Sequence, residues 1–582
     1  MSIQTFLIED PRISKSAIND VTVGVKSGPA SSTVQKYQPN SNSSTNVLWN
    51  VNVPSENTLV DRHIYIEGKL QFIMTTPNDS SGVTKFGFAP SAFPFNSMLQ
   101  SASLMINNSK VTVQSQDILS VVTKQMHQKY LSQHFQGTAH YVDKYFANMS
   151  DATALNGQSN PLGGFNSSEK DSDTLGRGSA RLTVAQQIVN GISVPVTISN
   201  GVISLEKNAQ YLVSIEFNEP IIGLPSTSLS ENDGCYTGLN QLELSVQFLS
   251  NFKKAFNMGY IDPAQTDAIP ISGITFSAGS AASTDSNLLS NASKLCFRYY
   301  SLHPSQYAKM SKKSVIPFDE MIAYKTPFYG ITANQQETNV ISLRQIPDKL
   351  YIFMKNRNDN AQLDLSHNLV VPITGLTVNF NNVAGLLSEM NQYDLYLMSR
   401  RNGSQQTFEE FIGLSGTTCS LGSYVVVDCT RDLGLDDMLS ASSLGQFSLQ
   451  IKVAWEPIKN DAIWESYAGT ASSLLPMDLI VVANYGGILV TEQGSSSVMS
   501  GLLTKQAVID AKSKGSSNID YEDVAKVSGG SLFKQGKAEV GRMLKSERGR
   551  IAKAVDARVD GAVDAVAARG KQEGHSRLEK YY

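Results

Sequence analysis

The chain has 582 residues, more than one ordinary core can organise, so we expect at least two domains. Charged residues make up only 17% of it and the formal net charge is −4, which excludes a chain that is basic throughout. Short polar clusters rich in Ser, Asn, Gly and Thr separate apolar runs of about five to eight residues, a pattern that predicts an all-β protein with many turns.

In chain order, the first half contains two predicted strands before a long loop-rich stretch and two after it. They are "DRHIYIEG" (61–68), "SASLMINN" (101–108), "YLVSIEFNEPIIGL" (211–224) and "LELSVQF" (242–248). The last alternates apolar and polar residues, so one face of that strand should lie in a core. A helix is predicted at 115–133, where apolar residues recur on one face and Ser115 could cap the start.

The second half repeats these features in the same order. Its strands are "DKLYIFMK" (348–355), "TGLTVNFNN" (374–382), "YVVVDCTRDLGL" (424–435) and "FSLQIKV" (447–453). A second helical segment is predicted at 385–399, again after the strand that ends in an Asn pair. Chance likeness between two β domains is the alternative, but four features in one order favour a tandem duplication of a β-sandwich.

The two halves differ mainly in the connection after the second strand. It runs from Asn108 to Tyr211 in the first half, 211 − 108 = 103 residues, and from Asn382 to Tyr424 in the second, 424 − 382 = 42 residues. The first half therefore carries an insertion of roughly sixty residues whose composition is typical of loops.

The C-terminal segment has a different character. From residue 530 to the end there are 12 Lys and Arg against 7 Asp and Glu, which is +5, so the preceding residues carry −4 − 5 = −9. Apolar residues follow one helical stripe there: Val540, Leu544, Ile551, Val555, Val559, Ala562 and Val566. An exposed charged helix or a disordered tail is one interpretation. A basic arm that contacts nucleic-acid phosphates, a partner protein or a membrane surface is the other.

Motifs for catalysis and cofactor binding are missing from the sequence. It has no G-x-S-x-G and no H-E-x-x-H, and its seven histidines show no clear ligand spacing. Its four cysteines, Cys235, Cys296, Cys419 and Cys429, form no C-x-x-C pair. No secretory signal is recognisable at the N-terminus and no stretch reaches the length of a membrane span. We therefore expect a protein that is not an enzyme, has no cofactor or metal site, and is used in a reducing compartment.

The same landmarks carry a resemblance to a known family. The chain resembles the double jelly-roll major capsid proteins of virophages and Maverick/Polinton-type elements, which are related to those of the adenovirus lineage. The residues that carry it are "TLVDRHIYI" (58–66), "SAFPFNSMLQSASLMINNSKV" (91–111), "NPLGGF" (160–165), "LGRGSARLTV" (175–184), "IPDKLYIFMK" (346–355), "LGQFSLQIKV" (444–453) and "MDLIVVANYGGILV" (477–490).

This resemblance implies an all-β fold of two tandem jelly-roll β-sandwiches, with short inserted helices and a helical or disordered tail. It also implies a homotrimeric, pseudo-hexagonal capsomer that contacts neighbouring capsomers and a vertex (penton) protein. The expected product is an icosahedral shell around a double-stranded DNA genome, located in the virion and assembled in the cytoplasm or nucleus of a host cell. A ligand- or glycan-binding tandem jelly roll is the alternative function, although only three tryptophans are present to serve as aromatic platforms.

The resemblance also predicts processing of the tail. Adenovirus-type cysteine proteases cut after the second Gly of an apolar-x-Gly-Gly sequence, and "VSGG" (527–530) approaches it, with Gly529 and Gly530 at the candidate cleavage site. "MSGL" (499–502) is a second candidate. The candidate residues for contact with the genome or an inner component are Lys545, Arg548, Arg550, Lys553 and Arg558.

These features predict four segments. An N-terminal arm spans 1–20. The first jelly roll spans 21–257, with a long loop insertion at about 135–182. The second jelly roll spans 258–500, and the basic tail, a candidate for removal, spans 501–582.

Overall fold

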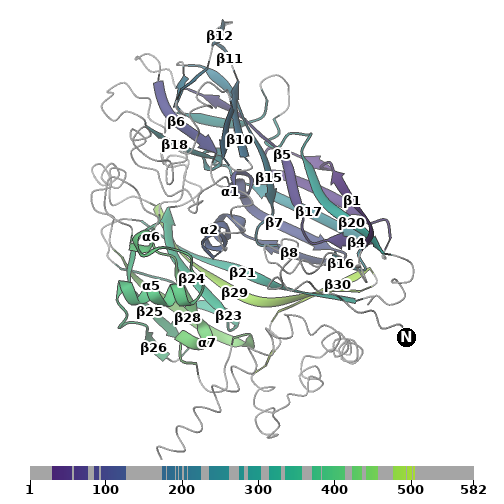
Figure 1. Cartoon of the computed structure of the whole chain (residues 1–582). Helices are drawn as coiled ribbons and strands as arrows, with labels where there is room; N and C mark the ends of the chain where they lie inside the picture. Colours follow the sequence, from purple (N-terminus) through teal and green to yellow (C-terminus); the bar gives the residue numbers. More distant parts are fainter. Residues whose placement is uncertain are drawn as a thin grey trace, which may run out of the picture. The chain divides into compact units, whose positions relative to one another are not determined.

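The structure is a computed structural model of the whole chain (Figure 1). It describes residues 29–55, 58–76, 84–90, 93–125, 174–177, 180–185, 187–189, 192–194, 196–199, 202–205, 208–224, 235–260, 274–280, 286–302, 313–329, 335–356, 370–381, 383–412, 422–435, 441–455, 476–492, 494–500 and 503–504. The chain divides into two compact units, 1–501 and 502–582. Both halves of the sequence repeat belong to the first unit.

The first half folds as two facing antiparallel sheets. One contains β1 (Pro29–Tyr37), β20 (Lys294–Leu302), β5 (Tyr65–Thr75) and β15 (Gln210–Pro220), paired in that order. The other contains β3 (Asn46–Asn52), β17 (Gln241–Phe248), β7 (Leu99–Ile106) and β8 (Ser109–Val113). Two sheets of four strands are the jelly-roll arrangement that the sequence predicts.

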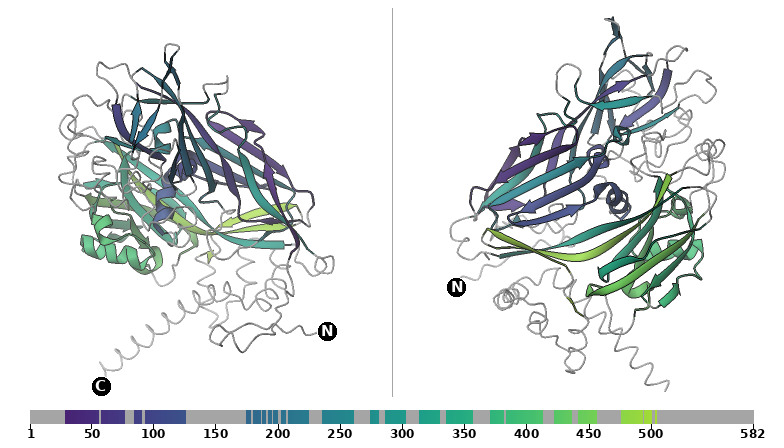
Figure 2. Two further views of the ribbon diagram at one scale, coloured as in Figure 1. Left: turned by 45° about the horizontal axis from the view of Figure 1, so that its top comes forward. Right: turned by 180° about the vertical axis from the view of Figure 1, so that it is seen from behind.

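The second half repeats this pairing strand for strand. Its first sheet is β21 (Lys313–Tyr329), β29 (Pro476–Glu492), β24 (Lys349–Asn356) and β27 (Val425–Asp428). Its second sheet is β23 (Ile341–Gln345), β28 (Ser443–Trp455), β25 (Ile373–Phe380) and β26 (Val383–Leu386). The four repeated sequence features occupy matching places in the two halves, so the tandem double jelly roll is confirmed (Figure 2).

A helix follows the last strand before the long connection in each half, as predicted, but the boundaries differ. Helix α2 is Ser115–Gln125, and residues 126–133 of the predicted helix lie outside the described residues. Helix α5 is Gln392–Arg401 and begins later than predicted, because β26 and a turn with positive φ at Gly385 and Leu387 precede it. Asn391 caps α5 through the amides of Tyr393 and Asp394.

Ser115 does not cap α2. It is the first residue of the helix, and its buried hydroxyl has no hydrogen-bond partner. The N-cap prediction was therefore wrong by one position, since the short polar side chain lies inside the helix rather than ahead of it.

The remaining elements decorate this frame. In the first half they are β2 (Ser41–Asn42), β4 (Leu59–Asp61), β6 (Thr84–Pro90), α1 (Pro94–Met98), β9 (Thr174–Arg177), β10 (Ala180–Ala185), β11 (Gln187–Val189), β12 (Ile192–Val194), β13 (Thr197–Ser199), β14 (Val202–Leu205), β16 (Cys235–Tyr236), the 3-10 helix η4 (Phe252–Ala255), β18 (Phe256–Tyr260) and β19 (Thr275–Ala278). In the second half they are β22 (Gln335–Glu337), α6 (Phe408–Ile412), α7 (Cys429–Asp432) and β30 (Ser495–Ser500), and β31 (Leu503–Thr504) lies in the second unit.

The long connections of the first half build a small sheet of their own. Strands β13, β14, β6 and β18 pair in that order. They come from three different connections of the jelly roll: the one that contains β6, the long one between α2 and β15, and the one after β17. Within the predicted insertion at 135–182, β9 and the start of β10 are strands, although the composition of this segment predicted only loop.

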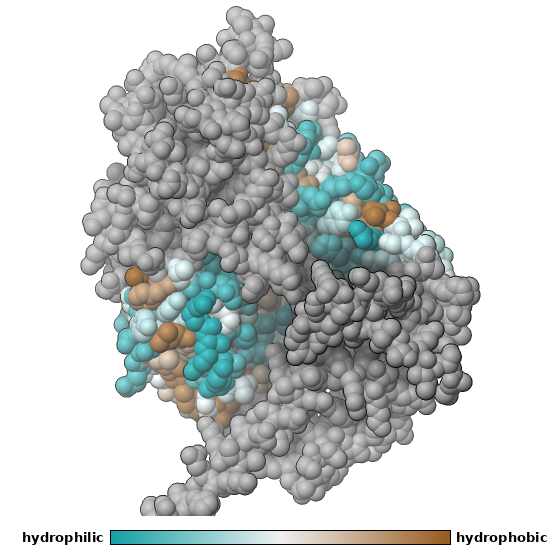
Figure 3. All heavy atoms as spheres, in the orientation of Figure 1, coloured by the Kyte–Doolittle hydropathy of each residue, from teal (hydrophilic) through white to brown (hydrophobic). Residues whose placement is uncertain are grey.

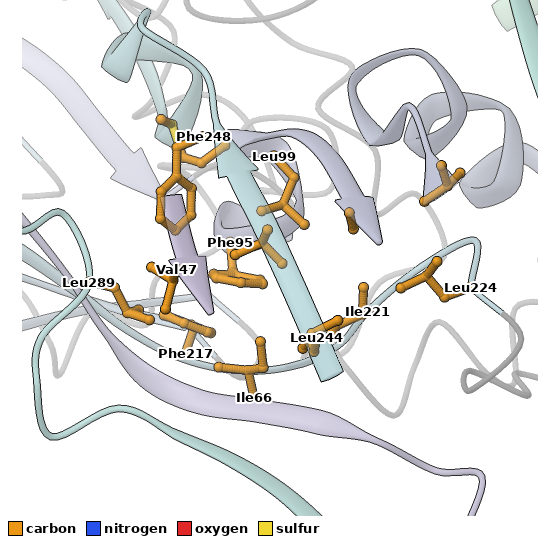
Figure 4. Close-up of a cluster of buried hydrophobic side chains, with 14 of the residues drawn as sticks. Val47, Ile66, Phe95, Leu99, Phe217, Ile221, Leu224, Leu244, Phe248 and Leu289 are labelled. Carbon is orange, nitrogen blue, oxygen red and sulfur yellow. The ribbon is translucent and has the colours of Figure 1, made fainter. Parts of the chain in front are cut away.

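The core of the first half fills the space between its two sheets. Side chains of β5 and β15 meet those of β17 and β3, with Phe95 of α1 between them (Figure 4). Phe95 stacks on Phe217, with ring centroids 4.8 Å apart. The second half has its own core, in which Leu376 and Val378 of β25 join Ile352 and Val425. Alternating burial along β17 and β28 confirms the period-two pattern.

The boundary predicted between 257 and 258 is not where strand pairing places the division. β19 pairs with β5, and β20 pairs with β1, β4 and β5, so both strands after 258 belong to the first jelly roll's sheet. The first strand of the second jelly roll begins at Lys313. The pairing favours a division between Leu302 and Lys313.

Candidate functional site: the contact between the two jelly rolls

Two strands in one sheet of the second half, β24 and β29, are buried on both faces over most of their length. Along β24, Leu350, Ile352 and Met354 join the core of their own half. The residues between them, Tyr351 and Phe353, join the core cluster of the first half instead. A strand covered on both sides needs a continuous apolar sequence, and this is the physical reason for runs such as "YIFM".

Helix α2 of the first half is the element that this sheet helps to cover. Ile118 and Val121 on α2 belong to the same hydrophobic cluster as Tyr351 and Phe353 of the second half, and the helix is also largely buried on its polar side. The Tyr351 hydroxyl donates to Oε1 of Gln125 at 2.9 Å. The two halves therefore share an apolar core rather than a wet surface contact.

A buried ion cluster lies within this contact. The Asp117 carboxylate of α2, 1% exposed, is 2.7 Å from Lys325 Nζ and 3.3 Å from Lys355 Nζ. Lys355 is equally buried and also donates to the Gln116 carbonyl at 2.8 Å. Burial lowers the pKa of Lys355, and the Asp117 charge acts in the opposite direction. Burial, reinforced by the Lys355 charge, lowers the pKa of Lys254 on η4 to about 7.

A second polar contact joins the halves at β30. The Ser109 amide donates to Ser496 Oγ at 3.0 Å, and the Ser496 amide donates to Asn108 Oδ1 at 2.7 Å. The Gly494 amide donates to the Gly238 carbonyl at 3.0 Å. The turn between β7 and β8 is thus attached to the last strand of the second jelly roll.

The chemistry of these residues is structural. Among the residues described, no group of three or more His, Cys, Asp or Glu is placed to hold a metal ion. No described helix is long and apolar enough to span a membrane. Burial is the first cause of the pKa shifts of Glu219, Lys254 and Lys355.

Glu219 illustrates this. It lies near the end of β15 and is 1% exposed. Its carboxylate accepts hydrogen bonds from the Phe95 amide at 3.1 Å, the Asn96 amide at 3.0 Å and Asn96 Nδ2 at 2.8 Å. Burial raises the pKa of Glu219 to about 7, and the three donors act in the opposite direction. The neighbouring Glu216 is half exposed and forms an ion pair with Lys69. Glu219 therefore fastens α1 to the end of β15.

Comparison with known families decides where this fold belongs. A family profile described as the Sputnik virophage major capsid protein 1st domain matches residues 1–300, more than half of the chain. The chain belongs to the Sputnik virophage major capsid protein family. A second profile, described as the major capsid protein V20 C-terminal domain, matches residues 323–487. The gap between the two matches contains the division at 302–313 that strand pairing favours.

Individual relatives agree with this assignment. The putative capsid protein V20 of Sputnik virophage is 22% identical over 567 residues, covering 92% of this chain and 86% of the relative. A 3.5 Å cryo-EM structure of the Sputnik virophage matches with a TM-score of 0.66 at 21% identity, over 90% of this chain and 98% of that one. The mavirus major capsid protein matches with a TM-score of 0.60 at 13% identity, over 88% and 98%.

Membership in this family gives the chain a structural role as a component of the virion capsid, not that of an enzyme. Contact with neighbouring capsid subunits follows from that role. The Polinton part of the resemblance stays a prediction.

The structure does not describe the residues that the sequence singled out as sites in this capsid protein. Gly529, Gly530 and the five basic residues, Lys545, Arg548, Arg550, Lys553 and Arg558, lie outside the described residues. The residues that join the jelly rolls were missed. Their signal was present: Lys355 ends an otherwise apolar strand, and Asp117 lies one residue before the apolar pair Ile118 and Leu119. A charge in such a place predicts a buried partner.

Proposed function

We propose that this capsid protein forms homotrimers whose six jelly rolls make a pseudo-hexagonal tile of an icosahedral shell around a double-stranded DNA genome. The observation that carries the proposal is the shared core between the two halves, with Asp117 buried between Lys325 and Lys355. That contact makes one chain a rigid pair of similar units. Three such pairs supply six units, enough to surround a hexagonal position.

Rigidity matters for a shell because each tile must present its edges at fixed angles to its neighbours. A jelly roll supplies a stiff sandwich, while its end connections vary in length without disturbing the sheets. The small sheet β13–β14–β6–β18 is built from such connections. The first half can therefore carry a distinct surface on the same frame that the second half uses.

Native mass spectrometry of the purified protein tests the trimer. We expect a species at three times 63.2 kDa, about 190 kDa, that persists on dilution to micromolar protein. A stable monomer under the same conditions would contradict the trimer and favour the alternative of a ligand- or glycan-binding module.

We infer further that the basic tail is used in assembly and then removed by a maturation cysteine protease after Gly530. The sequence "VSGG" at 527–530 supports this proposal. Intact mass measurement of the protein from mature particles should give chains that end at Gly530. Chains that end at Tyr582 would exclude the cleavage.

For the tail itself, the proposed partner is genome DNA or an inner component, contacted through the basic residues between 545 and 558. Binding that depends on phosphate contacts weakens steeply with salt, because it releases counterions. A synthetic peptide of residues 531–582 should bind duplex DNA at about 50 mM salt and lose at least roughly tenfold in affinity by about 200 mM. Salt-independent binding, or none at the lower salt concentration, would contradict this.

The proposal is completed by a vertex protein where the hexagonal tiles leave five-fold positions, and by assembly within a host cell. We propose the division into jelly rolls at 21–302 and 313–500, with an N-terminal arm before and the tail from 501. Strand pairing supports the division after Leu302.

A further inference from the structure

The two helices α2 and α5 occupy the same place in the repeat but have opposite exposure. α2 is largely buried against the second half, whereas α5 exposes Tyr393 and Leu397 by 52% and 46%. Brown, apolar side chains accordingly appear among teal ones in the space-filling view, over the elements around α5 (Figure 3). An exposed apolar helix face on a capsid protein is a candidate contact surface.

The helices align residue by residue without a gap. "SQDILSVV" from Ser115 matches "QYDLYLMS" from Gln392, which places Asp394 where α2 has Asp117. Ile118 and Val121 join the core of the first half, and their counterparts Leu395 and Met398 join the core of the second. The remaining face is therefore the same face in both helices. In α2 it is covered by the other half.

The sheets align as well. "YIEGK" (65–69) in β5 matches "YIFMK" (351–355) in β24, with Ile66 and Ile352 both facing inward. This shifts the predicted alignment of the two strands by one residue, because the burial pattern rather than Asp61 and Asp348 sets the register. A tyrosine pair repeats in the same register too. Tyr37 and Tyr299 share a hydrogen bond at 2.9 Å, and Tyr324 and Tyr485 hold the matching places on β21 and β29.

These alignments identify a vacant counterpart of the internal contact. Tyr351, Phe353 and Lys355 form the outward face of β24, and Tyr351 and Lys355 contact α2 directly. Their counterparts Tyr65, Glu67 and Lys69 form the outward face of the first jelly roll's sheet, where the Lys69 and Glu67 side chains are 37% and 31% exposed. Among the residues that the structure describes, no sheet covers the outward face of α5, and no helix covers the outward face of the sheet that contains β5.

We propose that α5 of one copy docks on the outward face of β5, β20 and β15 in a second copy, repeating between chains the contact that α2 makes within one. The proposal rests on the proposed trimer and names its surface. A ring of three chains would then contain six helix-on-sheet contacts of one kind, three internal and three between chains. The occupant is a second copy because the complementary helix belongs to this same chain.

Individual contacts follow from the internal ones. Asp117 lies against Lys355, so Asp394 should lie against Lys69 of the neighbouring copy. The side chain of Ser120 lies beside the Tyr424 hydroxyl in the internal contact. The pairings of Ile66 with Glu219 and Ile352 with Val425 make Asn218 the counterpart of Tyr424, so Leu397 should lie against Asn218.

The proposed contact between chains is more polar than the contact within one chain, as assembly from soluble subunits requires. Apart from the buried ion pair of Asp117 and Lys355, the internal face is mainly apolar, and it closes once, as the chain folds. The outward face of the first sheet carries the ion pairs Lys36–Glu67 at 2.5 Å and Lys69–Glu216 at 3.2 Å, so it tolerates water before the copies meet. Contacts between subunits that are soluble on their own are commonly more polar than cores.

Disulfide trapping tests the contact directly. Asn218 is exposed, so Leu397→Cys and Asn218→Cys in one chain should give covalent ladders of two and three chains on oxidation of the full-length protein. Neither single variant should do so. Leu397→Cys with Ser32→Cys, an exposed position on the distant strand β1, is the matched control and should stay monomeric on a denaturing gel. The proposal is overturned if the designed pair gives no ladder, or if the control gives the same ladder.

A substitution in α5 distinguishes failure of this contact from failure of the protein to form trimers at all. Leu397→Asp should raise the protein concentration needed for trimers by at least about tenfold. Val340→Asp, at an apolar residue that is 64% exposed in the same half, should leave it unchanged. A wild-type protein that never trimerises would refute the proposed function. Trimers that form equally well with Leu397→Asp would refute only the docking of α5.

Discussion

At the residue scale, buried charged side chains hold elements of the fold together through hydrogen bonds and ion pairs. Glu219 stands beside a tight turn, a place where a carboxylate could serve as a catalytic acid. In the structure its partners are the backbone and side chain of Phe95 and Asn96, and no second titratable group faces it among its hydrogen-bond partners. Its role is to hold α1 under the core.

Glu219 should make stability depend on pH. Burial raises its pKa from 4.5 to about 7, so between these values the folded protein holds a proton that the unfolded chain releases. Its contribution to stability is therefore complete below pH 4.5 and falls as the pH rises to about 7. Relative to Glu219→Gln, the wild-type free energy of unfolding should fall across this window by roughly 3 kcal/mol at most. Urea denaturation at the two ends of the window measures it, and a constant difference would contradict the assignment.

Asp117 should be more important than its single charge suggests. Asp117→Ala leaves Lys355 buried without this counter-charge, which should cost about 3–5 kcal/mol of unfolding free energy. Adding Lys355→Met should recover more than half of that loss, because the second change removes the uncompensated charge. Chemical denaturation of both variants measures it.

The matched control for Asp117 is Arg344→Met. It breaks a 2.8 Å ion pair with Glu320 in which the Arg side chain is 57% exposed, so it should cost under about 1 kcal/mol. Equal losses from Arg344→Met and Asp117→Ala would show that burial of the cluster contributes nothing.

At the element scale, the sequence predicts the strands well and their partners poorly. Alternation identifies β17 and β28, and the Asn pairs mark the ends of β7 and β25. The continuous apolar runs of β24 and β29 also predict strands. That these runs are continuous because another jelly roll covers their outer face depends on residues far away in the chain, such as Asp117. The apolar runs and the charges of Lys355 and Asp117 indicate burial, but no local pattern identifies the element that covers the outer face.

The predicted start of helix α5 was inaccurate for a similar reason, because the apolar pattern does not show the backbone turn that precedes the helix. The apolar stripe of 385–399 is real, but Gly385 at φ 78 and Leu387 at φ 63 turn the chain before the helix can start. Likewise, the composition of the predicted insertion is that of a loop, yet β9 becomes a strand because β10 offers it an edge to pair with. Tertiary partners override composition in both cases.

The contact of β30 with the β7–β8 turn can be tested by one hydroxyl. Ser496→Ala removes the acceptor of the Ser109 amide and the donor to the Ile106 carbonyl, so we expect a loss of about 1–2 kcal/mol in thermal or chemical denaturation. Ser495→Ala is the control, because that exposed hydroxyl donates to the Glu492 carbonyl of its own turn. If both variants unfold like the wild type, the contact does not stabilise the pair of jelly rolls.

At the scale of the whole molecule, we propose that one geometry serves both within and between chains. The internal repeat gives each chain two similar outward sheet faces, on β5 and on β24, and two similar helices, α2 and α5. The face on β24 and helix α2 contact each other inside the chain. The remaining pair is what a ring of three copies needs. Assembly would then use a helix-on-sheet contact of the same kind as the one that forms when each chain folds.

Cryo-EM reconstruction of the purified full-length oligomer, at a resolution that separates helices from strands, can distinguish the possible arrangements. We expect three chains in a ring of six jelly rolls, with α5 of each chain lying on β5, β20 and β15 of its neighbour. A ring in which α5 faces solvent, or particles that contain single chains, would contradict the shared geometry.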